Sequence, residues 1–123
     1  MDLSENRNNH PNLITLVENG MCQTAGQAFT QSIIVPWDDP IETIKAKTVA
    51  ELDASLFQKL SDYEPEIIVL ATGSNIEYPD TDLLAPLVEN NIGLEVMTNS
   101  AAARTFNVLM AENRHVLCLF IIG

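Results

Sequence analysis

The chain has 123 residues, of which 46% are apolar, so it is long and hydrophobic enough to form a domain with a sizeable core. Seventeen acidic residues against six basic ones give a net charge of -11, which repels phosphate backbones and anionic lipids and argues against a nucleic-acid partner. The longest apolar run, residues 116–122, is too short to cross a bilayer, and the first residues lack the order of a signal or transit peptide. We therefore expect a cytoplasmic protein without a membrane span.

The composition changes once near the start of the chain. Residues 1–12 are polar and include Pro11, which is typical of a loose lead-in. Residues 13–123 contain no internal repeat and no low-complexity linker, so we expect them to form a single α/β domain. Cys22 and Cys118 lie far apart, and Cys118 sits within an apolar run, so the sequence predicts free thiols that pack as small hydrophobes and no disulfide.

The first third of the domain is predicted to be rich in β-structure. Residues 13–20 read as a strand that ends at a turn on Asn19 and Gly20. Residues 28–37 read as a second strand that is stopped by a proline, and residues 41–52 favour a further short strand because of their β-branched side chains. We expect this part to add strands or a hairpin to the domain.

The rest of the chain alternates between helix and strand patterns. The predicted elements are a helix that is capped by Asp53 and ends near residue 64, a strand over 66–73, a helix over 79–91, a strand over 94–97, a helix over 101–112 and a strand over 116–122. Pro86 fits only near the first turn of its helix, and Asn91 and Gly93 supply the left-handed stop. This alternation predicts a sheet whose faces are covered by helices.

Two loops that follow predicted strands carry polar residues. In open α/β sheets, ligands favour the edge where the carboxyl ends of the strands lie. The residues that we expect at this edge, as a candidate ligand or partner site, are Thr72, Gly73, Ser74, Thr98, Asn99 and Ser100. The free N–H groups of the following helix could bind an anion there. The alternative, which we favour, is that Gly73 only makes the turn and Ser100 only caps the helix, because the spacing of a phosphate-binding motif is absent.

The last helix combines a core face with two polar residues. Its core face is predicted to comprise Ala102, Ala103, Phe106, Leu109 and Met110. Arg104 and Asn107 lie on an adjacent side and complete the candidate site, because a guanidinium and an amide together suit a carboxylate or a partner's backbone. The alternative reading, which is favoured, pairs Arg104 internally with Glu95 or Glu112 and uses Asn107 to tie down a loop.

No arrangement of residues typical of catalysis is evident. His10 and His115 are isolated from each other and from the cysteines, so the sequence predicts no metal site, no cofactor and no Cys/His dyad. Trp37 lies at a predicted strand end, where it is either a core residue or an exposed anchor for another protein. We favour the core position. The chain is therefore more readily interpreted as a non-enzyme.

Two long stretches resemble a known family. They are "PEIIVLATGSNIEYP" and "NNIGLEVMTNSAAARTFNVLMAENRHV", and the likeness extends back through "LDASLFQKL" and "FTQSIIVP" to about residue 13. They resemble the small domain of the mitochondrial complex I (NADH dehydrogenase) assembly factor 3 and the adipogenesis-associated domain protein. Ala71 stands where this family usually has glycine, Ala103 where cysteine is frequent, and Asn99 where threonine is common. Thiol chemistry at this helix is thus excluded here.

The resemblance implies a three-layer α/β fold with a mixed central sheet, and no catalytic residues. Two hypotheses follow for function. The first is a bacterial accessory or assembly factor that acts through contacts with protein partners. The identity of the partners and the oligomeric state of the chain are left open. The second is a small-molecule domain, with or without an enzymatic activity, that binds an anion or carboxylate at residues 72–74 and 98–107.

Overall fold

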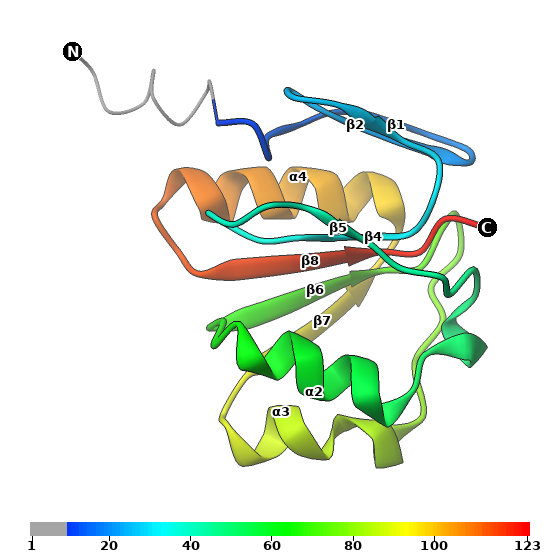
Figure 1. Cartoon of the computed structure of the whole chain (residues 1–123), viewed down its shortest axis with the longest axis vertical. Helices are drawn as coiled ribbons and strands as arrows, with labels where there is room; N and C mark the ends of the chain where they lie inside the picture. Colours follow the sequence, from blue (N-terminus) through cyan, green and yellow to red (C-terminus); the bar gives the residue numbers. More distant parts are fainter. Residues whose placement is uncertain (1–9) are drawn as a thin grey trace.

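The computed structural model describes residues 10–123 (Figure 1). Its elements are β1 (Ile14–Glu18), β2 (Met21–Thr24), β3 (Ala28–Phe29), β4 (Ile33–Val35), β5 (Glu42–Thr43), the 3-10 helix η1 (Val49–Glu51), α2 (Ala54–Asp62), β6 (Ile67–Ala71), the 3-10 helix η2 (Thr81–Leu84), α3 (Ala85–Glu89), β7 (Gly93–Met97), α4 (Asn99–Ala111) and β8 (Val116–Phe120). Of the predicted lead-in, residues 1–9 lie outside the described part. Asn12, by contrast, is buried, and its amide donates to the backbone oxygens of Pro36 and Asp39, both at 2.8 Å.

The central sheet is mixed and has the strand order β5-β4-β8-β6-β7. β6 runs parallel to both of its neighbours, β7 and β8, whereas β4 is antiparallel to β8 and β5. β8 is buried along its whole length and β6 at all positions after Ile67. Both faces of these strands are therefore covered, which explains their unbroken apolar sequences. The predicted α/β fold with a mixed central sheet is confirmed.

Alternate side chains of the central strands enter two separate cores. On one face, Val69 and Cys118 pack with Phe106 of α4. On the other face, Leu70 and Leu119 pack with side chains of α2 and α3. Figure 1 shows α4 on one side of the sheet and α2 with α3 on the other. The period of two along each strand thus divides the apolar residues between two helical layers.

The β-rich N-terminal part forms a second sheet, with the order β1-β2-β3. This sheet lies over the outer side of α4, which is therefore held between two sheets (Figure 1). The core face predicted for this helix is confirmed, because Ala102, Phe106 and Met110 are buried and Leu109 packs against the same core. Ala103 is also buried and lines a groove shared with β1. Small side chains suit a helix that has neighbours on two sides.

The prediction of one strand over residues 28–37 was wrong. The chain leaves the second sheet after β3 and enters the central sheet at β4. Ser32 lies at the transition and is buried, and its hydroxyl accepts from Ile122 N at 2.7 Å and donates to Ile122 O at 3.3 Å. A contact with the far end of the chain therefore fixes the break, and local sequence carries no sign of it. The strand β2 was also missed.

The predicted helix ends agree with the structure more closely. Asp53 caps α2 by accepting from Leu56 N at 2.8 Å. The region predicted as a helix over 79–91 begins as η2 and becomes α3, in which Pro86 lies in the first turn. Asn91 has a φ of 55°, as expected for a left-handed stop. Gly93 does not share this role, because it is already the first residue of β7.

A polar cluster joins β5 to α2. Tyr63 Oη donates to Glu42 Oε2 at 2.7 Å, and Lys59 Nζ lies 3.2 Å from the same oxygen. The bond from Tyr63, and then Lys59, lower the pKa of Glu42 below its ordinary value of 4.5. Burial, and then the Glu42 carboxylate, raise the pKa of the Tyr63 hydroxyl above its ordinary value of 10.0. The cluster therefore contributes its full stabilisation only at pH values above the ordinary pKa of Glu42, 4.5, and below the ordinary pKa of Tyr63, 10.0.

We expect Tyr63→Phe to lower the free energy of unfolding by about 1 kcal/mol at neutral pH, because one charge-assisted hydrogen bond is lost at a half-exposed site. Stability normally falls as pH drops below the ordinary pKa of Glu42, because that carboxyl takes up its proton more readily in the unfolded chain. It also falls above the ordinary pKa of Tyr63, where the unfolded chain releases its proton first. Urea unfolding across the pH range should show both slopes reduced in the variant. Tyr78→Phe, at a tyrosine that is 75% exposed, is the control and should change neither slope.

Candidate functional site

The loop after β6 and the start of α4 meet at the carboxyl edge of the central sheet. Asn99 Oδ1 accepts from Gly73 N at 2.8 Å, and Asn99 N donates to Gly73 O at 2.9 Å. Asn99 Nδ2 also donates to Ile121 O at 3.3 Å, beyond the end of β8. Gly73 has a φ of 98°, which strains any residue with a side chain. The structure therefore brings the two predicted turns together, and one asparagine joins them.

The threonines predicted for this edge have local roles. Thr72 Oγ1 donates to Asn75 O at 2.7 Å and accepts from Glu77 N at 3.1 Å, which shapes the loop. Thr98, not Ser100, caps α4, since its hydroxyl accepts from Ala101 N at 3.4 Å. Ser100 lies inside the first turn. Both threonine hydroxyls are thus occupied by the backbone beside them.

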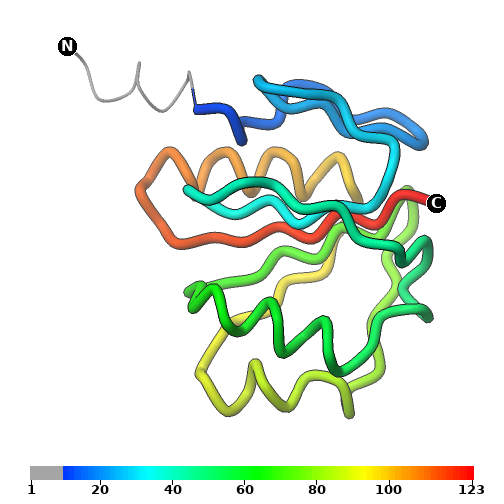
Figure 2. Tube along the Cα trace, in the orientation of Figure 1, coloured from blue at the N-terminus to red at the C-terminus, as the bar shows by residue number. Residues whose placement is uncertain are grey.

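Six of the eight predicted residues line two neighbouring hollows, and the other two line neither. Gly73, Ser74, Asn99 and Ser100 line a hollow of about 330 Å³, together with the turn between β1 and β2 and the last residues of the chain. Figure 2 shows the loop after β6, the turn between β1 and β2 and the C-terminal end of the chain on the same side of the molecule. Ser100 also lines a groove of about 270 Å³ between β1 and α4, which contains Arg104 and Asn107. Thr72 and Thr98 line neither.

Asn107 holds β1 against α4. Its Oδ1 accepts from Ile14 N at 2.9 Å, and its Nδ2 donates to Ile14 O at 2.8 Å. The side-chain amide therefore bonds both backbone groups of one residue, as a neighbouring strand would. This is the alternative in which Asn107 ties down a segment of chain.

Arg104 and Glu95 do not form the predicted ion pair. Between residues 10 and 123, the ion pairs are His10–Asp38, Lys59–Glu42 and Arg114–Glu66, so neither Glu95 nor Glu112 neutralises Arg104. The physical reason is that the two side chains lie on different parts of the surface. Glu95 is exposed on the edge strand β7, whereas Arg104 lies on the side of α4 that borders β1. Arg104 is itself exposed.

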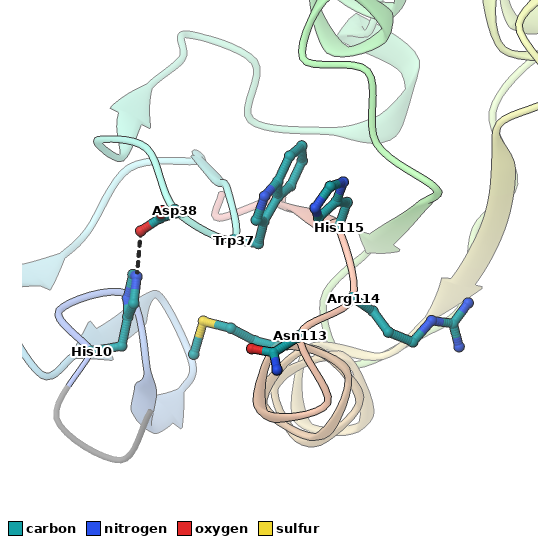
Figure 3. Close-up of a pocket in the computed structure, with 7 residues that line it drawn as sticks. His10, Trp37, Asp38, Asn113, Arg114 and His115 are labelled. Carbon is teal, nitrogen blue, oxygen red and sulfur yellow. Dashed lines mark hydrogen bonds and ion pairs between the residues drawn. The ribbon is translucent and has the colours of Figure 1, made fainter. Parts of the chain in front are cut away.

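A further hollow, of about 320 Å³, was not predicted (Figure 3). Trp37 and His115 stack there with ring centroids 4.7 Å apart, and Trp37 also packs against the core. His10 Nε2 lies 3.2 Å from Asp38 Oδ1 and Nδ1 accepts from Asn12 N at 3.0 Å, so the hydrogen bonds fix the orientation of the ring. Arg114 points away from the other labelled side chains in Figure 3.

No pattern in the sequence indicates this hollow, because the two histidines come from opposite ends of the chain and only tertiary folding brings them to one place. Within residues 10–123 there is no group of three or more His, Cys, Asp or Glu side chains arranged to hold a metal ion. His10 and His115 thus share a hollow without forming a set of metal ligands.

Both cysteines are buried and unbonded. Burial raises the pKa of Cys22 to about 11, and it raises that of Cys118 well above its ordinary value. A thiol is nucleophilic only after it loses its proton, so burial and the raised pKa both disfavour the reactive thiolate of these two groups at neutral pH. They pack in the core that faces α4, as the apolar surroundings of Cys118 in the sequence indicated.

Comparison with known proteins places this geometry in a family. The family profile described as "Protein of unknown function (DUF498/DUF598)" matches residues 14–121. The chain belongs to the DUF498/DUF598 family. Among curated relatives of this DUF498 protein, a Francisella tularensis protein named "13 kDa major membrane protein" is 27% identical over 88 residues, which cover 72% of this chain and 68% of that protein.

Solved structures of bacterial proteins share the fold. A Bordetella parapertussis protein matches with a TM-score of 0.82 and 28% identity, over 89% of this chain and 94% of the other. A Xanthomonas campestris protein matches with a TM-score of 0.78 and 34% identity, over 89% and 85%. A Bordetella pertussis protein described as a Mth938-like domain matches with a TM-score of 0.79 and 24% identity, over 89% and 85%. This DUF498 protein therefore has a Mth938-like fold.

The helices of the DUF498 protein are also informative about membranes. Across residues 10–123, none of them combines the length and the apolar character that a bilayer crossing requires.

Proposed function

We propose that this DUF498 protein is a non-enzymatic accessory protein that acts by contacting other proteins. The observation that carries the proposal is that most polar side chains at the candidate site are already hydrogen-bonded to the protein's own backbone. The amides of Asn99 and Asn107 bond the backbone of neighbouring elements, and the hydroxyls of Thr72 and Thr98 bond the backbone beside them. These groups support the scaffold, which leaves Arg104 as an exposed cation.

The surface around Arg104 has the composition of a protein contact. Leu16 lines the same groove and is 43% exposed, and Val108, one helical turn after Arg104, is 56% exposed. We call these three residues the Arg104 surface. An arginine fork beside exposed aliphatic side chains suits a partner that offers a carboxylate or backbone carbonyls next to an apolar residue.

The resemblance to complex I assembly factor 3 supports a role in assembling a membrane complex from its cytoplasmic side. An accessory protein that binds a membrane-embedded complex is recovered with the membrane even without a spanning helix of its own. The Francisella tularensis relative is named as a membrane protein, which accords with such an association.

A second candidate function is the binding of a small anion or carboxylate. It is favoured by the hollow that contains Gly73, Ser74 and Ser100, which lies at the N-terminal end of the thirteen-residue helix α4. A melting temperature that rises with carboxylate or phosphate anions in the unmodified protein would support this alternative. A smaller rise in Arg104→Ala would show that the anion also reaches the adjoining groove between β1 and α4, which contains Arg104.

Photo-cross-linking in the native cell tests the proposed function. A photoreactive phenylalanine analogue at position 108 should give a discrete adduct with another protein, and Arg104→Ala should reduce its yield about tenfold, as expected for a central contact residue. Arg104→Lys should give an intermediate yield, because the charge remains while the planar fork is lost. Arg114→Ala removes an equal charge beyond the C-terminal end of α4, outside the groove that contains Arg104, and should leave the yield unchanged. Absence of any discrete adduct from position 108 would count against the proposal.

A further inference from the structure

Two large apolar side chains are exposed on the loop that joins β6 to η2. Tyr78 is 75% exposed and Ile76 is 50% exposed. Exposed tyrosines of this kind are enriched in protein contacts, because the ring offers a large rigid area together with a polar hydroxyl.

A groove of about 440 Å³ lies beside Tyr78. It runs between this loop and η1, which Figure 1 shows next to each other at one side of the molecule. Its apolar lining comes from Val49, Leu52, Pro79 and Leu83. Val49, Leu52 and Leu83 belong to the core that faces α2 and α3, so the groove lies on the opposite face of the central sheet from the Arg104 surface. We call it the Tyr78 groove.

Both charged residues that line the Tyr78 groove are acidic. The two segments that form it, 49–53 and 77–83, carry five carboxylates and no lysine, arginine or histidine; the five are Glu51, Asp53, Glu77, Asp80 and Asp82. Glu77 and Asp80 line the groove itself. No lysine or arginine occurs between Lys59 and Arg104 in the whole chain. An apolar floor with a carboxylate border is complementary to a segment that has both aliphatic and cationic side chains.

We propose that the Tyr78 groove binds an extended segment of a partner protein in which lysine or arginine alternates with aliphatic residues. The aliphatic side chains enter the groove beside Tyr78, and the cations lie against Glu77 and Asp80. Phosphate-bearing partners do not fit, because both charged residues that line the groove are acidic. The proposal adds a second contact surface to the proposed function and rests on it only in that the occupant is a protein.

The test is a titration of the full chain with a labelled peptide of about nine residues in which lysine alternates with leucine, followed by fluorescence anisotropy. Tyr78→Ala should weaken binding about tenfold, since the exposed ring is the main apolar contact. Glu77→Gln should weaken it about threefold at low salt, with a smaller change at high salt. Both residues are exposed, so both variants should fold.

Matched controls separate the groove from general charge attraction. Val88 is 74% exposed on α3 and lies outside the groove, so Val88→Ala should bind as the unmodified chain does. Glu89→Gln removes an equal charge elsewhere and should have no effect. The proposal is overturned if the unmodified chain does not bind the peptide, if Tyr78→Ala binds as well as Val88→Ala, or if a peptide with serine in place of leucine binds equally. The cross-linking result at position 108 is independent of all three outcomes, so the proposed function can stand when this inference fails.

Discussion

Replacing Ala102 with leucine is expected to lower the free energy of unfolding by about 3 kcal/mol, since overpacking a well-packed core costs amounts of this order. Ala102 is fully buried where α4 packs on the central sheet, in the same core as Val69 and Phe106. The helix cannot retreat from a larger side chain, because the sheet of β1, β2 and β3 lies against its outer side. Urea unfolding, monitored by circular dichroism, measures the loss.

The control for this substitution is Ala54→Leu. Ala54 begins α2 and is exposed, so the same change in volume meets no neighbour and should alter stability by less than about 0.5 kcal/mol. If Ala102→Leu is as stable as Ala54→Leu, the close packing of α4 between two sheets is wrong.

The parts of the fold that local pattern determines were predictable. An unbroken apolar run identified β6 and β8 as strands covered on both faces, and Asp53 marked the start of α2 because a carboxylate can bond the first free N–H groups of a helix. The N-terminal region was harder. β3 and β4 are two and three residues long and belong to different sheets, and a contact between Ser32 and Ile122 separates them. No local period records a contact between residues so distant in sequence.

The candidate site shows the same limit at the level of side chains. The rule that parallel strands end at one edge of a sheet predicted that Gly73 and Asn99 would meet, and they do. The partner of each amide was not predictable. Asn107 bonds Ile14, whose position depends on how a separate sheet docks on α4, and that docking has no periodic signal. The Tyr78 groove likewise forms between η1 and a loop that lie far apart in sequence.

The bond between Asn107 and Ile14 is expected to control the docking of the second sheet. Asn107→Ala should lower the free energy of unfolding by about 3 kcal/mol, because two hydrogen bonds are lost and both backbone groups of Ile14 are left without their partner in a half-buried position. The loss of stability should be largest in the second sheet, in addition to the change for the whole domain. Amide hydrogen exchange at Ile14 and along β2 should become faster, while exchange in β6 and β8 follows only the change in global stability.

Asn107→Asp distinguishes the two bonds. Its carboxylate can still accept from Ile14 N, but it places an oxygen against Ile14 O where the amide had a donor, so the destabilisation should remain well above that of Asn75→Ala on an exposed loop. Exchange that is unchanged in β1 and β2 of Asn107→Ala would show that apolar packing alone holds the second sheet. In that case Arg104 and Leu16 would keep their relative positions without Asn107, and the Arg104 surface would not depend on this amide. If exchange is faster, cross-linking from position 108 should decline in Asn107→Ala, because Leu16 moves with β1.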